Sequence, residues 1–202
     1  MELYLFDKEY RDRFGLVCGC DEAGRGPLAG DVFAAAVVFD RDTVIDGIND
    51  SKKLSAKKRD ELFDLIKERA VAWSIKTASV AEIEEINILN SAMLAMKRAV
   101  EALGLEPDIC LIDGNRSPEL RFRTETVVKG DAKSQSIAAA SILAKVARDR
   151  YMEEMAQKYP EYRFEKHKGY GTKLHYEMID RYGPCEIHRP SFLRKYYAGR
   201  SE

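Results

Sequence analysis

Short apolar runs alternate with longer segments of helical periodicity along the 202-residue chain. Apolar runs of about four to eight residues that are rich in valine, alanine and phenylalanine are typical of buried strands. The predicted strands are residues 15–20, 32–39, 70–77, 109–112 and 124–128. The first three of them predict an antiparallel meander.

Two helical segments carry recognisable start signals. Residues 55–69 have an apolar stripe at helical spacing behind Ser55, a serine in the N-cap position. Ser79 and Glu82 have the spacing of a capping box, which opens a second helical region. This region has a break near residues 87–90 and ends at Gly104, a residue suited to a helix C-terminus.

The last third of the chain predicts a long helix over residues 134–159 and a loop over 162–171. A helix over residues 173–182 then precedes a basic tail that contains proline. No repeat, low-complexity linker or domain boundary is evident. We therefore predict one α/β domain, residues 1–202, in which helices flank a mixed five-stranded sheet and residues from about 160 to 202 form a C-terminal helical extension.

Charge changes this picture only locally. The 33 Lys and Arg residues almost balance the 34 Asp and Glu residues, so the net charge of −1 does not indicate a nucleic-acid partner. Residues 52–59, however, hold five basic residues and no acid, and cations also predominate over residues 129–150. Basic runs are more often solvated faces than binding sites, and that alternative stays open.

The N-terminus lacks the apolar segment of a signal peptide, and no apolar stretch approaches the ~20 residues of a membrane span. The four cysteines include Cys18 and Cys20, but no second cysteine pair or nearby histidine completes a zinc site. We therefore predict reduced core cysteines, a cytoplasmic location and, by default, a monomer.

Four carboxylates follow predicted strands. Asp21 and Glu22 end the first strand, Asp113 ends the fourth, and Asp131 comes between the fifth and the long helix. A buried carboxylate is costly unless something neutralises it. If the first and fourth strands are parallel neighbours, Asp21 and Asp113 lie side by side. Each then raises the pKa of the other, unless divalent cations lie between them.

Oxygen ligands without converging histidine or cysteine favour Mg²⁺ or Mn²⁺ over zinc. Two such ions about 3.5–4 Å apart stabilise the attacking and leaving oxygens of a phosphodiester displacement. The alternative is that each acid merely caps a helix or satisfies a loop. That alternative is strongest for Asp131, which directly precedes a helix.

Gly24, Gly26 and Gly30 follow the first two acids. A dinucleotide-binding turn requires the pattern Gly-x-Gly-x-x-Gly leading into a helix, whereas here the third glycine is one place late and a strand follows. Glycine also lets backbone groups approach a ligand closely, for example a sugar-phosphate held beside the acids. An ordinary tight turn is the alternative.

Six motifs together carry a family resemblance. They are CDEAGRGPLAG, NDSKKLS, LIDGN, KGDAKSQSIAAASILAKVARD, HKGYGT and HRPSF, in this order along most of the chain. In these motifs the chain resembles type 2 ribonuclease H (bacterial ribonuclease HII). The resemblance implies a ribonuclease H-like fold and two Mg²⁺ or Mn²⁺ ions per active site. It also implies hydrolysis of RNA in RNA–DNA hybrids and cleavage 5′ of ribonucleotides embedded in duplex DNA, leaving 3′-hydroxyl and 5′-phosphate ends.

Matched motif by motif, the resemblance also implies residue roles. Asp21, Glu22, Asp113 and Asp131 are implied to be the catalytic, metal-binding carboxylates, and Gly24, Arg25 and Gly26 to sense the ribose 2′-hydroxyl through their backbone. Tyr170 is implied to pack against the deoxyribose at the RNA–DNA junction. Lys52, Ser136, Ser141 and Lys145 are candidates for phosphate contacts.

Two rival functions stay open at this point. Another two-metal nuclease of the same fold, such as a resolvase, would share the carboxylates but not the glycine and tyrosine motifs. A non-enzymatic nucleic-acid-binding module would not need four acids that repel phosphates. A sliding-clamp contact through the C-terminal tail is conceivable, although no motif in the tail supports it.

Overall fold

The computed structural model describes residues 2–49 and 51–199. Asp50 of the NDSKKLS motif and residues 200–202 of the predicted extension therefore lie outside the described residues. The five strands are β1 (Val17–Ala23), β2 (Val32–Val38), β3 (Ala72–Ala78), β4 (Ile109–Asp113) and β5 (Thr124–Val127). They form one sheet in the order β3-β2-β1-β4-β5, with β1 to β3 antiparallel and β1, β4 and β5 parallel. The predicted meander and the mixed five-stranded sheet are confirmed.

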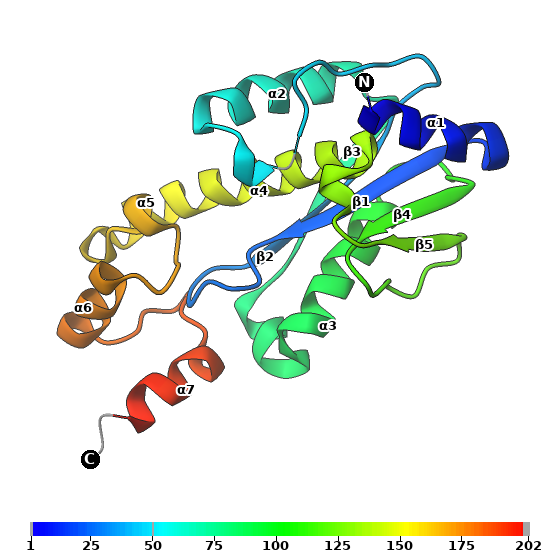
Figure 1. Cartoon of the computed structure of the whole chain (residues 1–202). Coiled ribbons are helices and arrows are strands. Elements are labelled where there is room, and N and C mark those ends of the chain that lie inside the picture. Colours follow the sequence, from blue (N-terminus) through cyan, green and yellow to red (C-terminus); the bar gives the residue numbers. More distant parts are fainter. Residues whose placement is uncertain (1, 50, 200–202) are drawn as a thin grey trace.

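Helices cover both faces of this sheet (Figure 1). On one face lies α3 (Val80–Glu101); on the other lie α1 (Glu2–Phe14), α2 (Ala56–Arg69) and α4 (Gln135–Lys158). The helices α5 (Phe164–His167), α6 (Lys173–Tyr182) and α7 (Pro190–Ala198) lie beyond one end of the sheet (Figure 1). None of the helices within residues 2–49 and 51–199 is long and apolar enough to cross a membrane.

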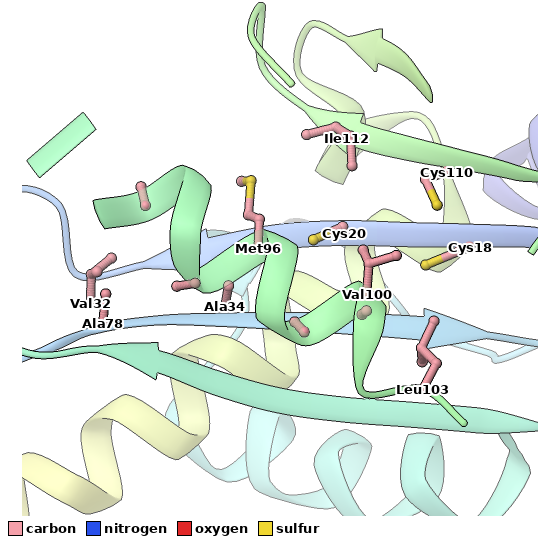
Figure 2. Packing of buried hydrophobic residues seen from close by; sticks show 14 of the residues in the cluster. Cys18, Cys20, Val32, Ala34, Ala78, Met96, Val100, Leu103, Cys110 and Ile112 are labelled. Atoms are coloured by element: carbon pink, nitrogen blue, oxygen red, sulfur yellow. The ribbon is translucent and has the colours of Figure 1, made fainter. Parts of the chain in front are cut away.

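The core between the sheet and α3 explains the cysteines. Figure 2 shows Met96 and Val100 of α3 facing Cys18, Cys20 and Cys110 of the two central parallel strands. These three cysteines are free thiols with no exposed surface, as the sequence predicted, whereas the fourth, Cys185, is a free thiol that is only partly buried. They serve as small apolar side chains that let α3 pack closely on β1 and β4.

On the opposite face, a glycine sets how closely α4 approaches. A Cβ atom on Gly19 of β1 would lie 2.2 Å from the carbonyl carbon of Ser136. No side chain fits there, so the N-terminal turns of α4 rest directly on β1. This contact brings Ser141 and Lys145, one and two turns further along α4, towards the end of β1.

Local start signals predicted the helix boundaries well. Ser55 caps α2, and Ser79 and Glu82 form the expected capping box of α3. The predicted break is at Asn87, whose φ of 67° interrupts α3, and its side-chain oxygen accepts hydrogen bonds from the N–H groups of Leu89 and Asn90. Asn87 thus ends one helical segment and caps the next.

Four features differ from the sequence-based expectation. The N-terminal segment and the basic tail form helices α1 and α7, and the latter begins at Pro190, a favoured first helical residue. The predicted loop over residues 162–171 contains the single-turn helix α5. Strand β1 continues to Ala23, so Asp21 and Glu22 lie within its last three residues and not beyond its end.

Candidate active site

The parallel register of β1 and β4 brings two carboxylates together. Cys20 of β1 is the partner of Ile112 of β4, and Asp21 and Asp113 are the next residues of the two strands. Successive side chains of a strand point to opposite faces. Asp21 and Asp113 therefore share the face covered by α4, and the predicted side-by-side arrangement is confirmed.

Glu22 points to the opposite face of β1, and Asp131 enters from a short 3₁₀ turn, Gly130–Ala132. A hydrogen bond of 2.7 Å from the Gly130 N–H to Asp113 Oδ1 holds this turn against the end of β4. Asp131 Oδ2 lies 3.8 Å from Lys52 Nζ, and Arg25 Nη1 lies 3.1 Å from Glu22 Oε1. The four carboxylates therefore gather from three separate elements at one end of the sheet.

The electrostatic cost of this arrangement is visible in the pKa values. Burial raises the pKa of Asp21 well above its usual value, and the charges of Glu22 and Asp113 raise it further. The Glu22 N–H and the Ser141 hydroxyl act in the opposite direction, because they stabilise the ionised carboxylate. Burial likewise raises the pKa of Glu22, partly offset by Arg25. The site therefore favours any cation that enters it.

The donor set fits a hard divalent cation, since every ligand offered is a carboxylate oxygen. Among the described residues, no three Asp, Glu, His or Cys side chains converge on one point as they stand. Arg25 and Lys52 supply positive charge to Glu22 and Asp131. A cation that enters the site would therefore compete with Arg25 for Glu22 and with Lys52 for Asp131.

A pocket of about 220 Å³ begins at Glu22 and extends along the glycine segment. Its walls come from β1, the following loop, the Ser51 turn, α4 and the loop before α6: Glu22, Ala23, Gly24, Arg25, Gly26, Ser51, Lys52, Ser141, Lys145 and Tyr170. Seven of the residues singled out in the sequence therefore lie in one pocket with Glu22.

The glycines of this pocket are required for different reasons. Gly24 has a φ of 102°, and a Cβ atom there would lie 2.3 Å from Arg148 Nε. Backbone conformation and packing thus both exclude a side chain at position 24. At Gly26 a Cβ atom would merely touch Tyr170 at 3.8 Å. This is an ordinary van der Waals distance, so packing within the protein does not exclude a small side chain at position 26, and Gly26 and Tyr170 are neighbouring walls of the pocket.

Two buried arginines that the sequence reasoning missed hold this loop in place. Arg189 has no exposed surface, and its guanidinium donates hydrogen bonds to the carbonyl oxygens of Gly24, Arg25, Pro27 and Gly30 at 2.6–3.2 Å. Arg148 of α4 donates to the carbonyls of Ala29 and Asp31 at 3.1 and 3.3 Å. Burial lowers the pKa of Arg189 to about 9, which still leaves it charged at neutral pH.

The three histidines of the chain connect Tyr170 to this arginine. His175 Nδ1 lies 3.0 Å from the Tyr170 carbonyl oxygen, which can only accept, so Nδ1 carries the proton. His175 Nε2 in turn accepts from His188 Nε2 at 3.0 Å, and the third ring, His167, stacks on His175. Burial lowers the pKa of His175 to about 3 and that of His188 to about 4, so these rings are neutral. Tyr170 and Arg189, the residue after His188, therefore belong to one packed unit.

The candidate phosphate contacts separate into two groups. Ser141, whose hydroxyl lies 2.9 Å from that of Ser51, and the Lys52 and Lys145 side chains line the pocket. Ser136 does not: it is fully buried, and its hydroxyl donates to Asp7 Oδ2 at 2.7 Å. This geometry gives no support to a phosphate contact by Ser136.

Comparison with known proteins places these features in a family. A family model described as Ribonuclease HII matches residues 18–195. Ribonuclease HII of Caldicellulosiruptor bescii is 57% identical over 93% of this chain and 91% of its own.

Among solved structures, ribonuclease H2 of Pyrococcus horikoshii OT3 is 27% identical with a TM-score of 0.76, covering 93% of this chain and 99% of its own. RNase HII of Archaeoglobus fulgidus, solved as a complex with PCNA, is 25% identical with a TM-score of 0.72, covering 87% and 94%. Bst-RNase HIII, solved with Mn²⁺, is 20% identical with a TM-score of 0.64, covering 83% and 63%, and shares the fold. The predicted ribonuclease H-like fold is confirmed.

The raised pKa of Asp21 predicts a specific dependence of stability on pH. A carboxyl whose pKa is higher in the folded chain contributes stability below its ordinary pKa and loses it as pH rises through the raised value. Without divalent metal, Asp21→Asn should therefore be more stable than wild type at neutral pH. The difference should be about 1.4 kcal/mol for every tenfold decrease that folding causes in the acid dissociation constant of Asp21. Urea unfolding in chelator, from about pH 4 to about pH 8, measures this. Asp42→Asn, at an exposed site, is the control, and an identical pH slope in Asp21→Asn and wild type would contradict the prediction.

The bonds from Arg189 predict that charge alone cannot replace its guanidinium. A lysine ammonium cannot reach carbonyls from Gly24 to Gly30 simultaneously, and each lost bond to a charged donor is worth about 1.5–3 kcal/mol. Arg189→Lys should lower the free energy of unfolding by at least about 2 kcal/mol. It should also speed hydrogen exchange at the Leu28 and Gly30 amides, which now bond to Gly169 and Ile187. Arg194→Lys on exposed α7 is the matched control; unchanged protection at both amides would rule out the anchoring role.

Proposed function

Because the chain belongs to the ribonuclease HII family and is accordingly a ribonuclease H-type nuclease, we propose that it cuts on the 5′ side of ribonucleotides embedded in duplex DNA. We further propose that it hydrolyses RNA paired to DNA and leaves 3′-hydroxyl and 5′-phosphate ends. The observation that carries this proposal is the single pocket that joins Glu22 to Gly24–Gly26 and Tyr170. A resolvase-like nuclease has no need for such a sugar-sized pocket beside its carboxylates.

The glycine segment supplies the sugar specificity in this proposal. A protein distinguishes RNA from DNA at a given position through the 2′-hydroxyl. Gly24, Arg25 and Gly26 line the pocket, and the two glycines place no side chain between their backbone and a ligand. Arg189 bonds to the Gly24 and Arg25 carbonyls, and Arg148 bonds to the Ala29 and Asp31 carbonyls further along the same loop, so the geometry of the loop is set before the substrate binds. Tyr170, 44% exposed across from Gly26, then packs on the deoxyribose that follows the ribonucleotide.

Metal dependence is general in this family, and we propose that two Mg²⁺ or Mn²⁺ ions bind to Asp21, Glu22, Asp113 and Asp131. When bound, a pair of such ions supplies Lewis-acid stabilisation of the attacking and leaving oxygens. The carboxylates hold the ions, and the raised pKa of Asp21 falls once a cation offsets its neighbours. The Mn²⁺ complex of Bst-RNase HIII, a protein of the same fold, supports this choice of ions.

Phosphate contacts in this proposal come from Lys52, Ser141 and Lys145. The Lys52 side chain is 81% exposed at the mouth of the pocket. Lys145 is half-buried and paired with Asp149 at 2.5 Å, and burial lowers its pKa. Both side chains lie where a backbone phosphate beside the sugar would pass.

We also propose a protein partner, an oligomeric state and a cellular location. RNase HII of Archaeoglobus fulgidus was solved with PCNA, which supports a sliding-clamp contact through the C-terminal tail of this chain as well. The tail is helical as far as Ala198, and residues 200–202 lie outside the described residues. We keep a monomeric state and a cytoplasmic location as proposals alongside it.

The decisive experiment compares two duplexes that differ by one hydroxyl. A DNA duplex with one ribonucleotide should be cut 5′ of that residue in Mg²⁺ or Mn²⁺, whereas the identical all-DNA duplex should be left intact. Asp113→Asn should abolish cleavage while the fold survives, because a neutral amide cannot replace the carboxylate as a metal ligand. Asp42→Asn serves as the matched control. Equal cleavage of both duplexes would favour the resolvase-like alternative.

Tyr170 separates sugar packing from metal binding. Tyr170→Ala should lose about tenfold to a hundredfold activity on a single embedded ribonucleotide, the usual worth of one aromatic stacking partner. Tyr170→Phe should retain most of it, since the ring face and not the hydroxyl makes the contact. Activity on an all-RNA hybrid and the metal concentration for half-maximal rate should change little. If Tyr170→Ala shifts only the metal requirement, Tyr170 supports the metal site and does not contact the junction.

A further inference from the structure

A second pocket of about 230 Å³ lies on the other side of the carboxylates. It shares Glu22 and Arg25 with the first pocket, and its other walls come from α3 and the loop after β4: Leu89, Met93, Asp113, Gly114, Asn115 and Arg116. Two hollows of similar size thus meet at Glu22. A nucleic-acid strand that passes over the carboxylates from one pocket therefore enters the other.

Arg116 distinguishes this second pocket chemically. It is exposed, and among the described residues it makes no hydrogen bond, ion pair or ring contact. The other two cations beside the carboxylates differ, because Arg25 pairs with Glu22 and Lys52 with Asp131. The Arg116 guanidinium therefore presents its N–H donors to an anion from outside, and its planar fork matches a phosphate.

The wall that α3 contributes to this pocket is apolar. Leu89 and Met93 are one helical turn apart on α3, directly after the interruption at Asn87, and both are half-buried. The Asn87 side chain caps this second part of α3 through the Leu89 and Asn90 amides, which fixes the wall in position. Such a wall suits the apolar face of a sugar or base, and it has no group that recognises a 2′-hydroxyl.

We propose that this second pocket receives the nucleotide on the 5′ side of the cut, and that Arg116 binds a backbone phosphate of that nucleotide strand. The inference rests on the proposed function: with the ribonucleotide beside Gly24–Gly26 and the cut on its 5′ side, the strand must leave the carboxylates in this direction. The apolar wall accepts ribose and deoxyribose alike. Sugar discrimination belongs to the first pocket, and the second supplies affinity and alignment.

The test uses Arg116→Gln and a series of duplexes with one ribonucleotide. Each duplex carries a neutral methylphosphonate in place of one phosphate, either 5′ or 3′ of the cut. Arg116→Gln should raise KM about tenfold, the usual effect of losing one charged hydrogen bond. It should also reduce the slope of the logarithm of the substrate binding constant against the logarithm of salt concentration by about one unit.

At one position on the 5′ side of the cut, a methylphosphonate should raise the KM of wild type by a similar factor. The same methylphosphonate should leave the KM of Arg116→Gln unchanged. The control is Arg121→Gln, an exposed arginine outside the pocket that pairs with Glu106 at 2.6 Å.

The outcomes separate the two proposals. If wild type does not cut the unmodified ribonucleotide duplex, the proposed function fails, and this inference fails with it. If wild type cuts it but Arg116→Gln keeps the wild-type KM and methylphosphonate profile, only the second pocket is overturned. A loss in Arg116→Gln that is the same at every position, or that appears only as a higher metal requirement, also overturns the phosphate contact. The phosphate contact is supported if the KM of wild type depends on one phosphate 5′ of the cut and this dependence disappears in Arg116→Gln.

Discussion

The structure depends above all on the hydrogen bonds from the buried Arg189 guanidinium to the carbonyls between Gly24 and Gly30. A buried guanidinium is tolerated only when its N–H groups are bonded, so the arginine and the loop hold each other in place. Arg148 contributes from α4 on the other side. A glycine-rich loop that would be mobile by itself is thereby made rigid, and the C-terminal helices become part of the site although they lie beyond the sheet (Figure 1).

A second constraint is the repulsion between Asp21 and Asp113. Parallel pairing of β1 and β4 places both on one face, where burial and the charges of Glu22 and Asp113 raise the pKa of Asp21. The fold accepts this cost at a point where every nearby element contributes polarity: the Ser141 hydroxyl from α4, the Gly130 amide and the Arg25 side chain. A site that is costly when empty of cations binds them more strongly, because binding relieves the repulsion as well as forming new bonds.

The charge distribution reconciles a nearly neutral chain with a nucleic-acid substrate. Carboxylates occupy the centre, and cations surround them: Arg25 and Lys52 next to the acids, Lys145 in the wall of the first pocket and Arg116 in that of the second. Phosphates of a bound strand would meet these cations on either side, while the ions held by the acids face the bond to be cut. Local arrangement, and not net charge, therefore provides the affinity.

The sequence by itself determined the elements whose signals are local. Strand runs, the caps at Ser55 and Ser79 and the break at Asn87 depend on residues a few positions apart, and the motif pattern singled out the four carboxylates. Helix α1 was missed although Phe6, Tyr10 and Phe14 recur at helical spacing, which is the signal that could have found it. Only the tertiary structure decided that Ser136 faces Asp7, and that Arg189 bonds to carbonyls 159 to 165 positions away. The Arg189 contacts leave no periodicity or spacing in the sequence, because their partners are backbone groups that any residue type would supply. The Asp7 carboxylate lies 129 positions from Ser136, so no local spacing connects these two side chains either.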